Sequence, residues 1–298
     1  FTAFLGFEVN EGEYKVMGMA PYGTPRQVDK VWKLIELARD GGFRLHMDYF
    51  AFHRSTTTTY SRKFVDLFGP PRNPDSKFFT ETSGYPSYFG EPPGNFHELA
   101  RENQHYADIA ASIQAVLEEV LLTMARALRR ETGQRNLCIA GGVGLNSVAN
   151  WKILREAGFD DLYVHPAAGD AGGALGAALY AHHTILGKPR SFVMEHASWG
   201  QAWDDGHVEE FLASCGVHAE RLRENDLLDR VVEAIARGAV VGWHQGRFEW
   251  GPRALGHRSI LADPRRAEMK DVVNTKIKFR EPYRPFAPSV LSERAGEF

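Results

Sequence analysis

The spacing of apolar residues along the chain predicts several helices and strands. The longest helical pattern covers residues 104–132, where apolar side chains recur every three or four positions and form one broad face; Gly133 is expected to end it. A shorter pattern over residues 26–40 predicts an amphipathic helix. A loose alternation of apolar and polar residues over positions 1–9 predicts a strand, and residues 10–23 are predicted to form a turn-rich segment with a helical centre.

Two consecutive segments near the middle repeat one plan. Residues 136–154 begin with a short buried strand, continue through a glycine-rich turn and end in a helix, and residues 161–183 repeat that order with an alanine-rich helix. Successive units of this kind are typical of an α/β sheet whose site lies at the carboxyl ends of the strands. The sequence therefore predicts the α/β fold class.

The composition changes after the second unit. Residues 186–206 combine Gly, Pro, Trp and acidic residues and read as a linker, so we place a domain boundary near residue 195. Helical patterns follow at 204–216 and 227–238. A buried strand is then expected at AVVGWHQG (239–246), directly before an arginine-rich segment.

Residues 43–96 form a loop-heavy, aromatic insertion with little periodicity. A long insertion of this kind is more often a binding lid than filler, and a surface excursion without function is the alternative. Its composition would suit a bulky, partly apolar hydroxyl compound. The aromatic residues on which this rests are Phe78, Phe79, Tyr85, Tyr88 and Phe89.

The bulk composition narrows the classes of protein. The 298 residues suggest one large domain or two smaller ones, and no run approaches the roughly 18 apolar residues of a membrane span. The first residues lack the pattern of a secretory signal. Cys138 and Cys215 sit in apolar stretches, so we predict buried, reduced thiols and a cytoplasmic location.

Positive charge is concentrated near the end of the chain. Residues 244–284 contain ten Lys and Arg against five Asp and Glu, a balance of +5 in a chain of net charge −3, which leaves −8 for the rest. A basic island in an acidic body suits a small anion better than a nucleic acid, which needs a broad basic face. We therefore expect no nucleic-acid partner and no membrane partner.

The arginine-rich segment 246–266 has features that would shape a pocket. Gly251-Pro252 forces a turn directly before Arg253, and an arginine fork matches phosphate or carboxylate. Further on, an extended run would place Lys276, Lys278 and Arg280 on one face, and prolines 282 and 285 would hold the chain rigid around Arg284. We predict a pocket for a small anion; a solvated basic loop is the alternative.

Other residues are candidates for a nucleotide site. Gly141, Gly142 and Gly144 permit a tight turn whose N–H groups, with the following helix N-terminus, could hold phosphate, although such turns also occur for packing reasons. Asp170, in the second turn, suits either a metal ligand or a helix N-cap. Lys15 is either a surface charge or a residue that faces a nucleotide.

Five motifs together resemble one enzyme family. They are GEYKVMGMAPYG (12–23), IAGGVGLNS (139–147), GDAGGALGAA (169–178), GRFEWGPRALGHRSILADPR (246–265) and KIKFREPYRPFAPSV (276–290). In this order, across nearly the whole chain, they resemble the O-carbamoyltransferases of nodulation-factor and antibiotic biosynthesis, the NodU/CmcH group. The two C-terminal motifs are specific enough to suggest the family alone.

The resemblance implies two domains and a reaction. Residues 1–195 would belong to an actin-like ATPase (ASKHA) domain, which holds ATP and carbamoyl adenylate, and residues 196–298 to a YrdC-like α/β domain, which takes carbamoyl phosphate. The carbamoyl group would pass to a hydroxyl of a small-molecule acceptor, a sugar or polyketide. A homodimer is common among such enzymes.

The resemblance also implies roles for residues. Arg253, Lys278 and Arg284 would hold carbamoyl phosphate. Asp170 would bind a divalent metal, iron(II) or magnesium, beside ATP. The nucleotide would contact Gly141, Gly142, Gly144 and Asn146, with Lys15 nearby.

The sequence departs from the family pattern in two ways. The paired metal-ligand histidines of the family, spaced H-x-x-x-H, are missing, so they are expected before residue 1, and the YrdC-like domain is expected to continue beyond residue 298. His257 stands where the family has asparagine, which leaves its role open.

Other functions remain possible on the sequence alone. A threonylcarbamoyl-tRNA-type modification enzyme would need a basic face for tRNA, which the −8 remainder argues against. A non-catalytic nucleotide-binding regulator would bind ATP without releasing phosphate from carbamoyl phosphate. A kinase of the actin-like superfamily would produce ADP.

Overall fold

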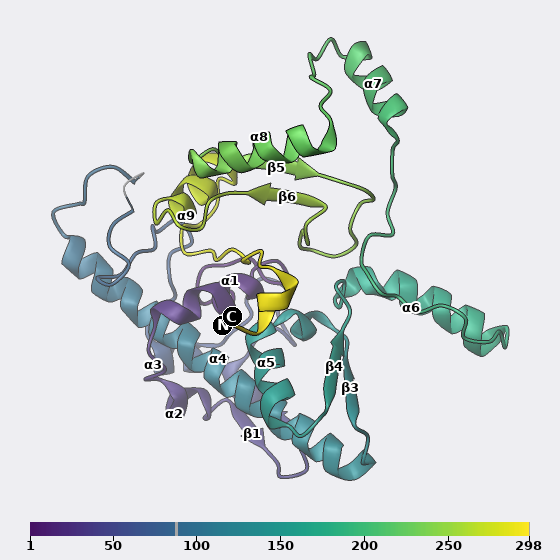
Figure 1. Ribbon diagram of the computed structural model, residues 1–298. Coiled ribbons are helices and arrows are strands. Elements are labelled where there is room, and N and C mark those ends of the chain that lie inside the picture. Colours follow the sequence, from purple (N-terminus) through teal and green to yellow (C-terminus); the bar gives the residue numbers. More distant parts are fainter. Residues whose placement is uncertain (87–88, 298) are drawn as a thin grey trace. The chain divides into compact units, whose positions relative to one another are not determined.

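The computed structural model describes residues 1–86 and 89–297 and has a mixed α/β character, which confirms the predicted class (Figure 1). Its chain forms two compact units. Unit 1 comprises Phe1–Cys138, Asn146–Tyr163 and Asn274–Phe298, and unit 2 comprises Ile139–Leu145 and Val164–Val273. In the described part of the chain, no helix is both long enough and apolar enough to cross a bilayer.

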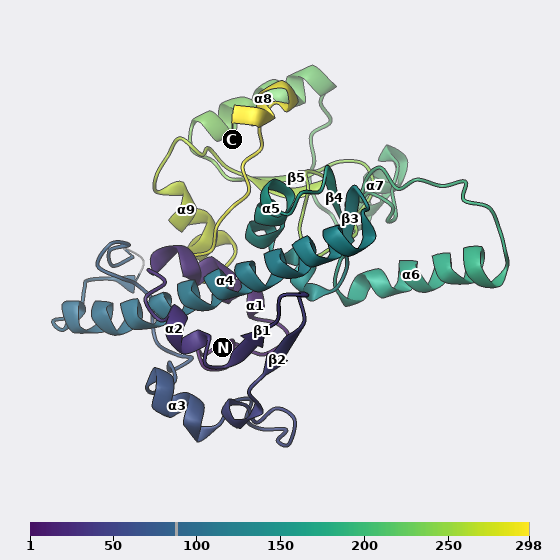
Figure 2. The same ribbon diagram turned by 90° about the horizontal axis from the view of Figure 1, so that it is seen from below.

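Unit 1 is built on one long helix, α4 (Phe96–Thr132). The predicted helix is confirmed and begins earlier than expected; it ends as predicted at Gly133, whose left-handed backbone at φ 66° favours glycine. The helices α1 and α2 pack along α4 (Figure 2). The other elements of this unit are α1 (Glu13–Met19), α2 (Val28–Val31), β1 (Ile35–Leu37), β2 (Phe43–Leu45), α3 (Arg62–Phe68) and α5 (Ser147–Glu156).

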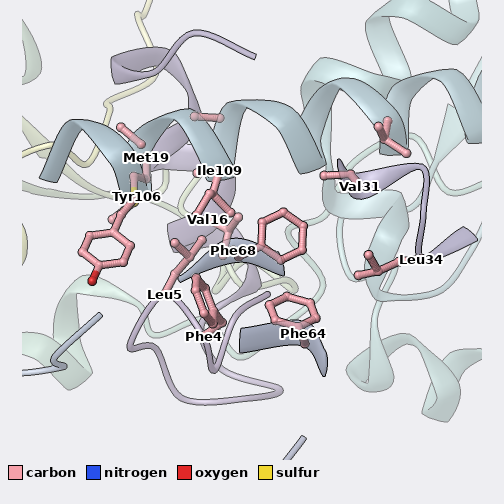
Figure 3. Packing of buried hydrophobic residues seen from close by; sticks show 14 of the residues in the cluster. Phe4, Leu5, Val16, Met19, Val31, Leu34, Phe64, Phe68, Tyr106 and Ile109 are labelled. Atoms are coloured by element: carbon pink, nitrogen blue, oxygen red, sulfur yellow. The ribbon is translucent and has the colours of Figure 1, made fainter. Parts of the chain in front are cut away.

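An aromatic cluster forms the core of unit 1. Phe4, Phe64 and Phe68 are almost completely buried, with the rings of Phe64 and Phe68 4.7 Å apart (Figure 3). Each such side chain contributes about 1.5–3 kcal/mol by leaving water. Tyr283, from near the end of the chain, belongs to the same cluster. The segment around residue 283 is therefore anchored in the core of unit 1.

Two predictions for the start of the chain are wrong. Residues 1–7 form hydrogen-bonded turns, such as Leu5 N–H to Phe1 O at 2.9 Å, rather than a strand, because Phe4 and Leu5 are buried side by side in the core. The expected helix over 26–40 is only four residues long. Its second half is β1, which pairs with β2 in a hairpin, so that Gly41, at φ 87°, belongs to the hairpin turn and does not cap a helix.

The two predicted strand–turn–helix units are confirmed. The first consists of β3 (Asn136–Ile139), a short 3₁₀ turn and α5; the second consists of β4 (Asp161–Val164), another 3₁₀ turn and α6 (Gly173–Tyr180). The strands β3 and β4 are hydrogen-bonded neighbours. Cys138, on β3, and Cys215 are both exposed, so the prediction of buried thiols is wrong. The prediction that the first strand is buried is also wrong: in β3, exposed and half-buried residues alternate, so one face of the strand is left open.

Unit 2 contains a hairpin beside a helix. The predicted strand before the arginine-rich segment is β5 (Val241–His244), which pairs antiparallel with β6 (Arg258–Leu261). The expectation that it is buried is wrong, since its residues alternate between half-buried and exposed. The helix α8 contacts β5 (Figure 1). The predicted helical patterns are confirmed as α7 (Asp205–Ser214) and α8 (Glu224–Ala236); α9 (Met269–Val272) follows the hairpin.

The compact units are interleaved along the sequence. Residues 274–298 belong to unit 1 with the first part of the chain, whereas the sequence suggested a single boundary near residue 195. The assignment of residues 1–195 and 196–298 to two family domains stays a prediction.

Candidate functional site

Basic side chains line a pocket of about 650 Å³ in unit 1. One wall is the start of α1, and the other is the loop that follows a π-helical turn at Val273–Ile277. The residues around it are Tyr14, Lys15, Lys278, Phe279, Arg280, Glu281 and Arg284. Two of the three residues predicted to hold carbamoyl phosphate, Lys278 and Arg284, are thus brought together, as is Lys15.

A buried asparagine shapes the basic loop. Asn274 has no exposed surface, and its side-chain N–H groups donate to the carbonyl oxygens of Pro282 at 3.1 Å and Arg284 at 3.0 Å. Its side-chain oxygen accepts from Nε of Arg280 at 2.6 Å. One side chain therefore fixes the backbone of the loop and one of its cations. No local pattern around Asn274 predicts this role, because the contacts are set by the fold of the loop.

Asn274→Ala should destabilise the protein by about 2 kcal/mol, because the substitution leaves two partly buried carbonyl groups without these hydrogen bonds. Urea unfolding followed by circular dichroism measures this loss. Asn225→Ala, at an exposed position on α8, is the comparison and should unfold like the wild type. An Asn274→Ala protein as stable as the wild type would contradict the role assigned to this side chain.

One carboxylate joins two of the basic residues. Glu281 accepts from Lys15 Nζ at 2.6 Å and lies 3.1 Å from a guanidinium nitrogen of Arg284. The Arg284 guanidinium also lies 4.3 Å from the centre of the Tyr14 ring, so that it is held on two sides. Burial alone would raise the pKa of the Glu281 carboxyl, but the hydrogen bond from Lys15 and the Arg284 charge lower it below its ordinary value.

The ion pair of Lys15 and Glu281 predicts a pH dependence. A carboxyl whose pKa is lower in the folded than in the unfolded protein stabilises the folded state at pH values above the unfolded pKa, which is ordinarily 4.5. This stabilisation is lost as the pH falls below 4.5 and through the lowered, folded-state pKa. Thermal unfolding between pH 3 and about pH 7 measures it. Glu281→Gln should flatten the acid limb of the curve, and a limb as steep as that of the wild type would contradict the expectation. Glu36→Gln, at an exposed carboxyl on β1, is the control.

The pocket keeps an excess of positive charge. Partial burial and the charges of Arg280 and Arg284 lower the pKa of Lys278. Cations crowd together in this way at a cost that an anion offsets. A single carboxylate, Glu281, faces four cations here among the pocket residues, so the site is suited to a small oxyanion.

The predicted extended run at 276–280 is wrong. Lys276 lies in the π-helical turn and is not among the pocket residues, and Phe279 has a left-handed backbone at φ 46°, which turns the chain. The expected rigidity around Arg284 does exist. Beside the prolines, it comes from Tyr283, whose ring lies 5.0 Å from that of Phe78 in the core.

The arginine-rich segment is in unit 2, and most of its arginines support the structure. Arg258 donates to the carbonyl oxygens of Gln245 and Gly246 across the hairpin. Glu249 accepts from the N–H groups of Leu255 at 2.6 Å and Arg258 at 3.0 Å, and so closes the turn that carries Arg253.

Arg253 itself is exposed. It makes no hydrogen bond or ion pair that the structure shows with residues 1–86 or 89–297. It belongs to unit 2, whereas Lys278 and Arg284 belong to unit 1. Its assignment to carbamoyl phosphate stays a prediction. His257 lies 3.3 Å from the carbonyl oxygen of Arg247, a contact within the same turn.

The glycine-rich turns of unit 2 meet each other. Gly141 N–H donates to Ala168 O at 2.7 Å, and a side chain at Gly144 would crowd Ile139 and Ala168. Gly251 has φ 134° and packs against the carbonyl of Pro166. The first turn of the arginine-rich segment is thus held beside the turn that precedes Asp170. These contacts give Gly141 and Gly144 a packing role, and their predicted contact with a nucleotide stays a prediction.

Asn146 and Asp170 are placed at helix starts. The Asn146 side chain accepts from Ala149 N–H at 3.1 Å as the N-cap of α5, and also pairs with Gln114. Asp170 is exposed and begins a 3₁₀ turn before α6. In the part of the chain that the structure describes, no three His, Cys, Asp or Glu residues cluster as metal ligands would. Asp170 as a metal ligand stays a prediction.

Comparison with known proteins identifies the family. The carbamoyltransferase N-terminus model matches residues 1–179, and the carbamoyltransferase C-terminus model matches residues 232–298. The chain belongs to the carbamoyltransferase family. The resemblance seen in the five motifs is thereby confirmed.

The relatives of this carbamoyltransferase chain are longer than it is. An uncharacterized protein of Synechocystis, sll1178, is 44% identical over all of this chain and 46% of its own length. Nodulation protein NolNO of Sinorhizobium fredii is 41% identical over 99% of this chain and 38% of its own length. The 3'-hydroxymethylcephem-O-carbamoyltransferase of Amycolatopsis lactamdurans is 35% identical over 71% and 39%. The chain spans less than half the length of these curated relatives.

Proposed function

We propose that the protein is an O-carbamoyltransferase that takes its carbamoyl group from carbamoyl phosphate. The observation that carries the proposal is the pocket of Lys15, Lys278, Arg280 and Arg284 in a chain of this family. Its four cations and one carboxylate match a compact dianion. A relative of the chain is named as a carbamoyltransferase for a hydroxymethyl group, which supports a hydroxyl as the acceptor here.

The pocket would act on the phosphate that leaves. Hydrolysis of carbamoyl phosphate breaks its carbonyl–oxygen bond or its phosphorus–oxygen bond and yields carbamate and inorganic phosphate. Lys278 and Arg284 would bind the phosphate oxygens and stabilise the charge that gathers on them. Glu281 would hold Lys15 and Arg284 in position.

ATP would then activate the carbamate. The carbamate oxygen attacks the α-phosphorus of ATP, which gives carbamoyl adenylate and pyrophosphate; the acceptor hydroxyl attacks the carbonyl carbon and releases AMP. We place ATP at the turn of Gly141, Gly142 and Gly144, beside Asn146. Asp170 alone does not make a metal site, so we derive no step through a metal ion. We also propose an ASKHA domain followed by a YrdC-like domain, a cytoplasmic location and a homodimer.

The products of ATP and carbamoyl phosphate test the proposal. The protein, supplied with both compounds and a hydroxyl acceptor, should form inorganic phosphate, AMP and pyrophosphate, and should form no AMP when carbamoyl phosphate is left out. Phosphorus NMR separates these products. ADP as the nucleotide product would overturn the proposal in favour of a kinase, and salt-sensitive retention of tRNA on a filter would favour the tRNA-modification alternative.

A further inference from the structure

A second pocket of unit 1, of about 350 Å³, lies where the aromatic insertion meets the first turns of α4. Its volume is within the range of about 300–1,000 Å³ that small-molecule sites occupy. The residues around it are Ser76, Lys77, Phe79, Tyr85, Pro93, Leu99, Glu102 and Asn103. Tyr88, which the sequence grouped with these aromatic residues, lies outside the described residues.

The apolar wall of this pocket is fixed by its neighbours. Phe79 is 2% exposed; its ring stacks on Phe96 at 5.4 Å and meets the edge of Tyr85 at 4.9 Å. Tyr85 also contacts Phe89 at 5.6 Å. Phe79 thus holds the half-buried Tyr85 ring in place, and it is Tyr85 that presents a preformed surface to a ligand at little entropic cost.

Two hydrogen-bond acceptors face the pocket without partners. Asn103 is 5% exposed, and its side-chain N–H donates to Lys77 O at 3.1 Å. Its side-chain oxygen accepts no hydrogen bond that the structure shows from residues 1–86 or 89–297. Glu102, next to it on α4, is exposed and forms no ion pair within these same residues. These two side-chain oxygens line the pocket, so a ligand hydroxyl can donate to them in place of water.

The positive charge of the pocket, Lys77, is held next to its aromatic residues. Lys77 Nζ lies 4.6 Å from the centre of the Phe89 ring and 3.4 Å from the hydroxyl of Tyr85. Lys77 and Glu102 thus give the pocket one charge of each sign. This balance disfavours a ligand with a large net charge of either sign.

We propose that this pocket binds the ring of a neutral, hydroxylated compound such as a sugar. The hydroxyl groups on one edge of the ring would donate to the Asn103 oxygen and the Glu102 carboxylate, and its apolar face would lie against Tyr85, which Phe79 supports from behind. The inference rests on the proposed function only in naming such a compound as the carbamoyl acceptor. The binding itself requires neither ATP nor carbamoyl phosphate.

Saturation-transfer NMR with three neutral methyl hexosides, of glucose, galactose and 2-acetamido-2-deoxyglucose, tests the pocket directly. The wild type should transfer saturation to the ring protons of at least one hexoside. For that hexoside, Glu102→Gln and Tyr85→Ala should each weaken binding roughly tenfold, because each removes one charge-assisted hydrogen bond or one aromatic face. Glu119→Gln, at an exposed carboxyl on the same helix, should leave binding unchanged.

Two results would overturn the inference. The first is that no saturation is transferred to any of the three hexosides, and the second is that the wild type and Glu102→Gln transfer saturation equally. Glu102→Gln changes one exposed side chain, so it carries the test if Tyr85→Ala fails to fold, which circular dichroism shows. The assay omits ATP and carbamoyl phosphate, so a loss of sugar binding with normal AMP formation would separate this inference from the proposed function.

Discussion

Arg284→Ala is expected to slow phosphate release from carbamoyl phosphate by about 100-fold or more, the usual effect of removing one charged donor from a developing anion. The side chain is only 15% exposed and is held by Glu281 and Tyr14, so its charge is already in place before the substrate arrives. Inorganic phosphate, measured by a coupled colour assay at saturating and limiting carbamoyl phosphate, gives both kcat and KM.

A matched control separates this effect from a general loss of charge. Arg62→Ala removes an arginine on α3 that is 86% exposed and pairs with Asp66, so its rate should be that of the wild type. Arg253→Ala, in the same assay, tests the third predicted cation. Phosphate release unchanged in Arg284→Ala would remove the basic pocket of unit 1 from the reaction.

Gly23→Ala is expected to destabilise the protein by about 3 kcal/mol, at the upper end of the cost of overpacking. A β-carbon at residue 23 would overlap the carbonyl group of Ala107 on α4, and backbone atoms of a central helix cannot move aside cheaply. The neighbouring Thr24 N–H donates to Asp108 at 2.8 Å, which holds the turn against the helix.

The midpoint of urea unfolding measures the loss. Gly94→Ala serves as the comparison, since a β-carbon there meets no atom within 4 Å, and this variant should unfold near the wild-type midpoint. Equal midpoints for Gly23→Ala and the wild type would show that the turn at residue 23 does not pack as described.

The sequence predicted the elements whose signals are local. The apolar face of α4 continues over many turns, and each glycine-rich turn stands between a short apolar strand and a helix, so these patterns survive whatever the rest of the chain does. Lys278 and Arg284 were predicted as pocket residues because cations and prolines lie close together in the sequence.

The failures concern features set by distant contacts. Residues 35–37 have helical spacing, but pairing with residues 43–45 makes them a strand. Glu281 and Asn274 were not predicted as site residues, since their roles depend on α1 and on the fold of the loop. Arg280 was predicted to share a face with Lys276 and Lys278 in an extended run, and it lines the pocket from a turned loop instead. Lys15 was expected near a nucleotide, and its partner Glu281 is far along the chain. One signal was available: REPYRP carries an acidic residue between two arginines.

The pairing of Lys15 with Glu281 also determines when the basic pocket can be completed during synthesis of the chain. The first half of the pocket leaves the ribosome with α1, but the second half emerges only with residues 278–284. Until then, the slot that Tyr283 fills in the aromatic core stays open to water. A nascent chain therefore carries an unfinished hydrophobic core until residue 283 has emerged, and chaperone occupancy should fall when this tyrosine docks.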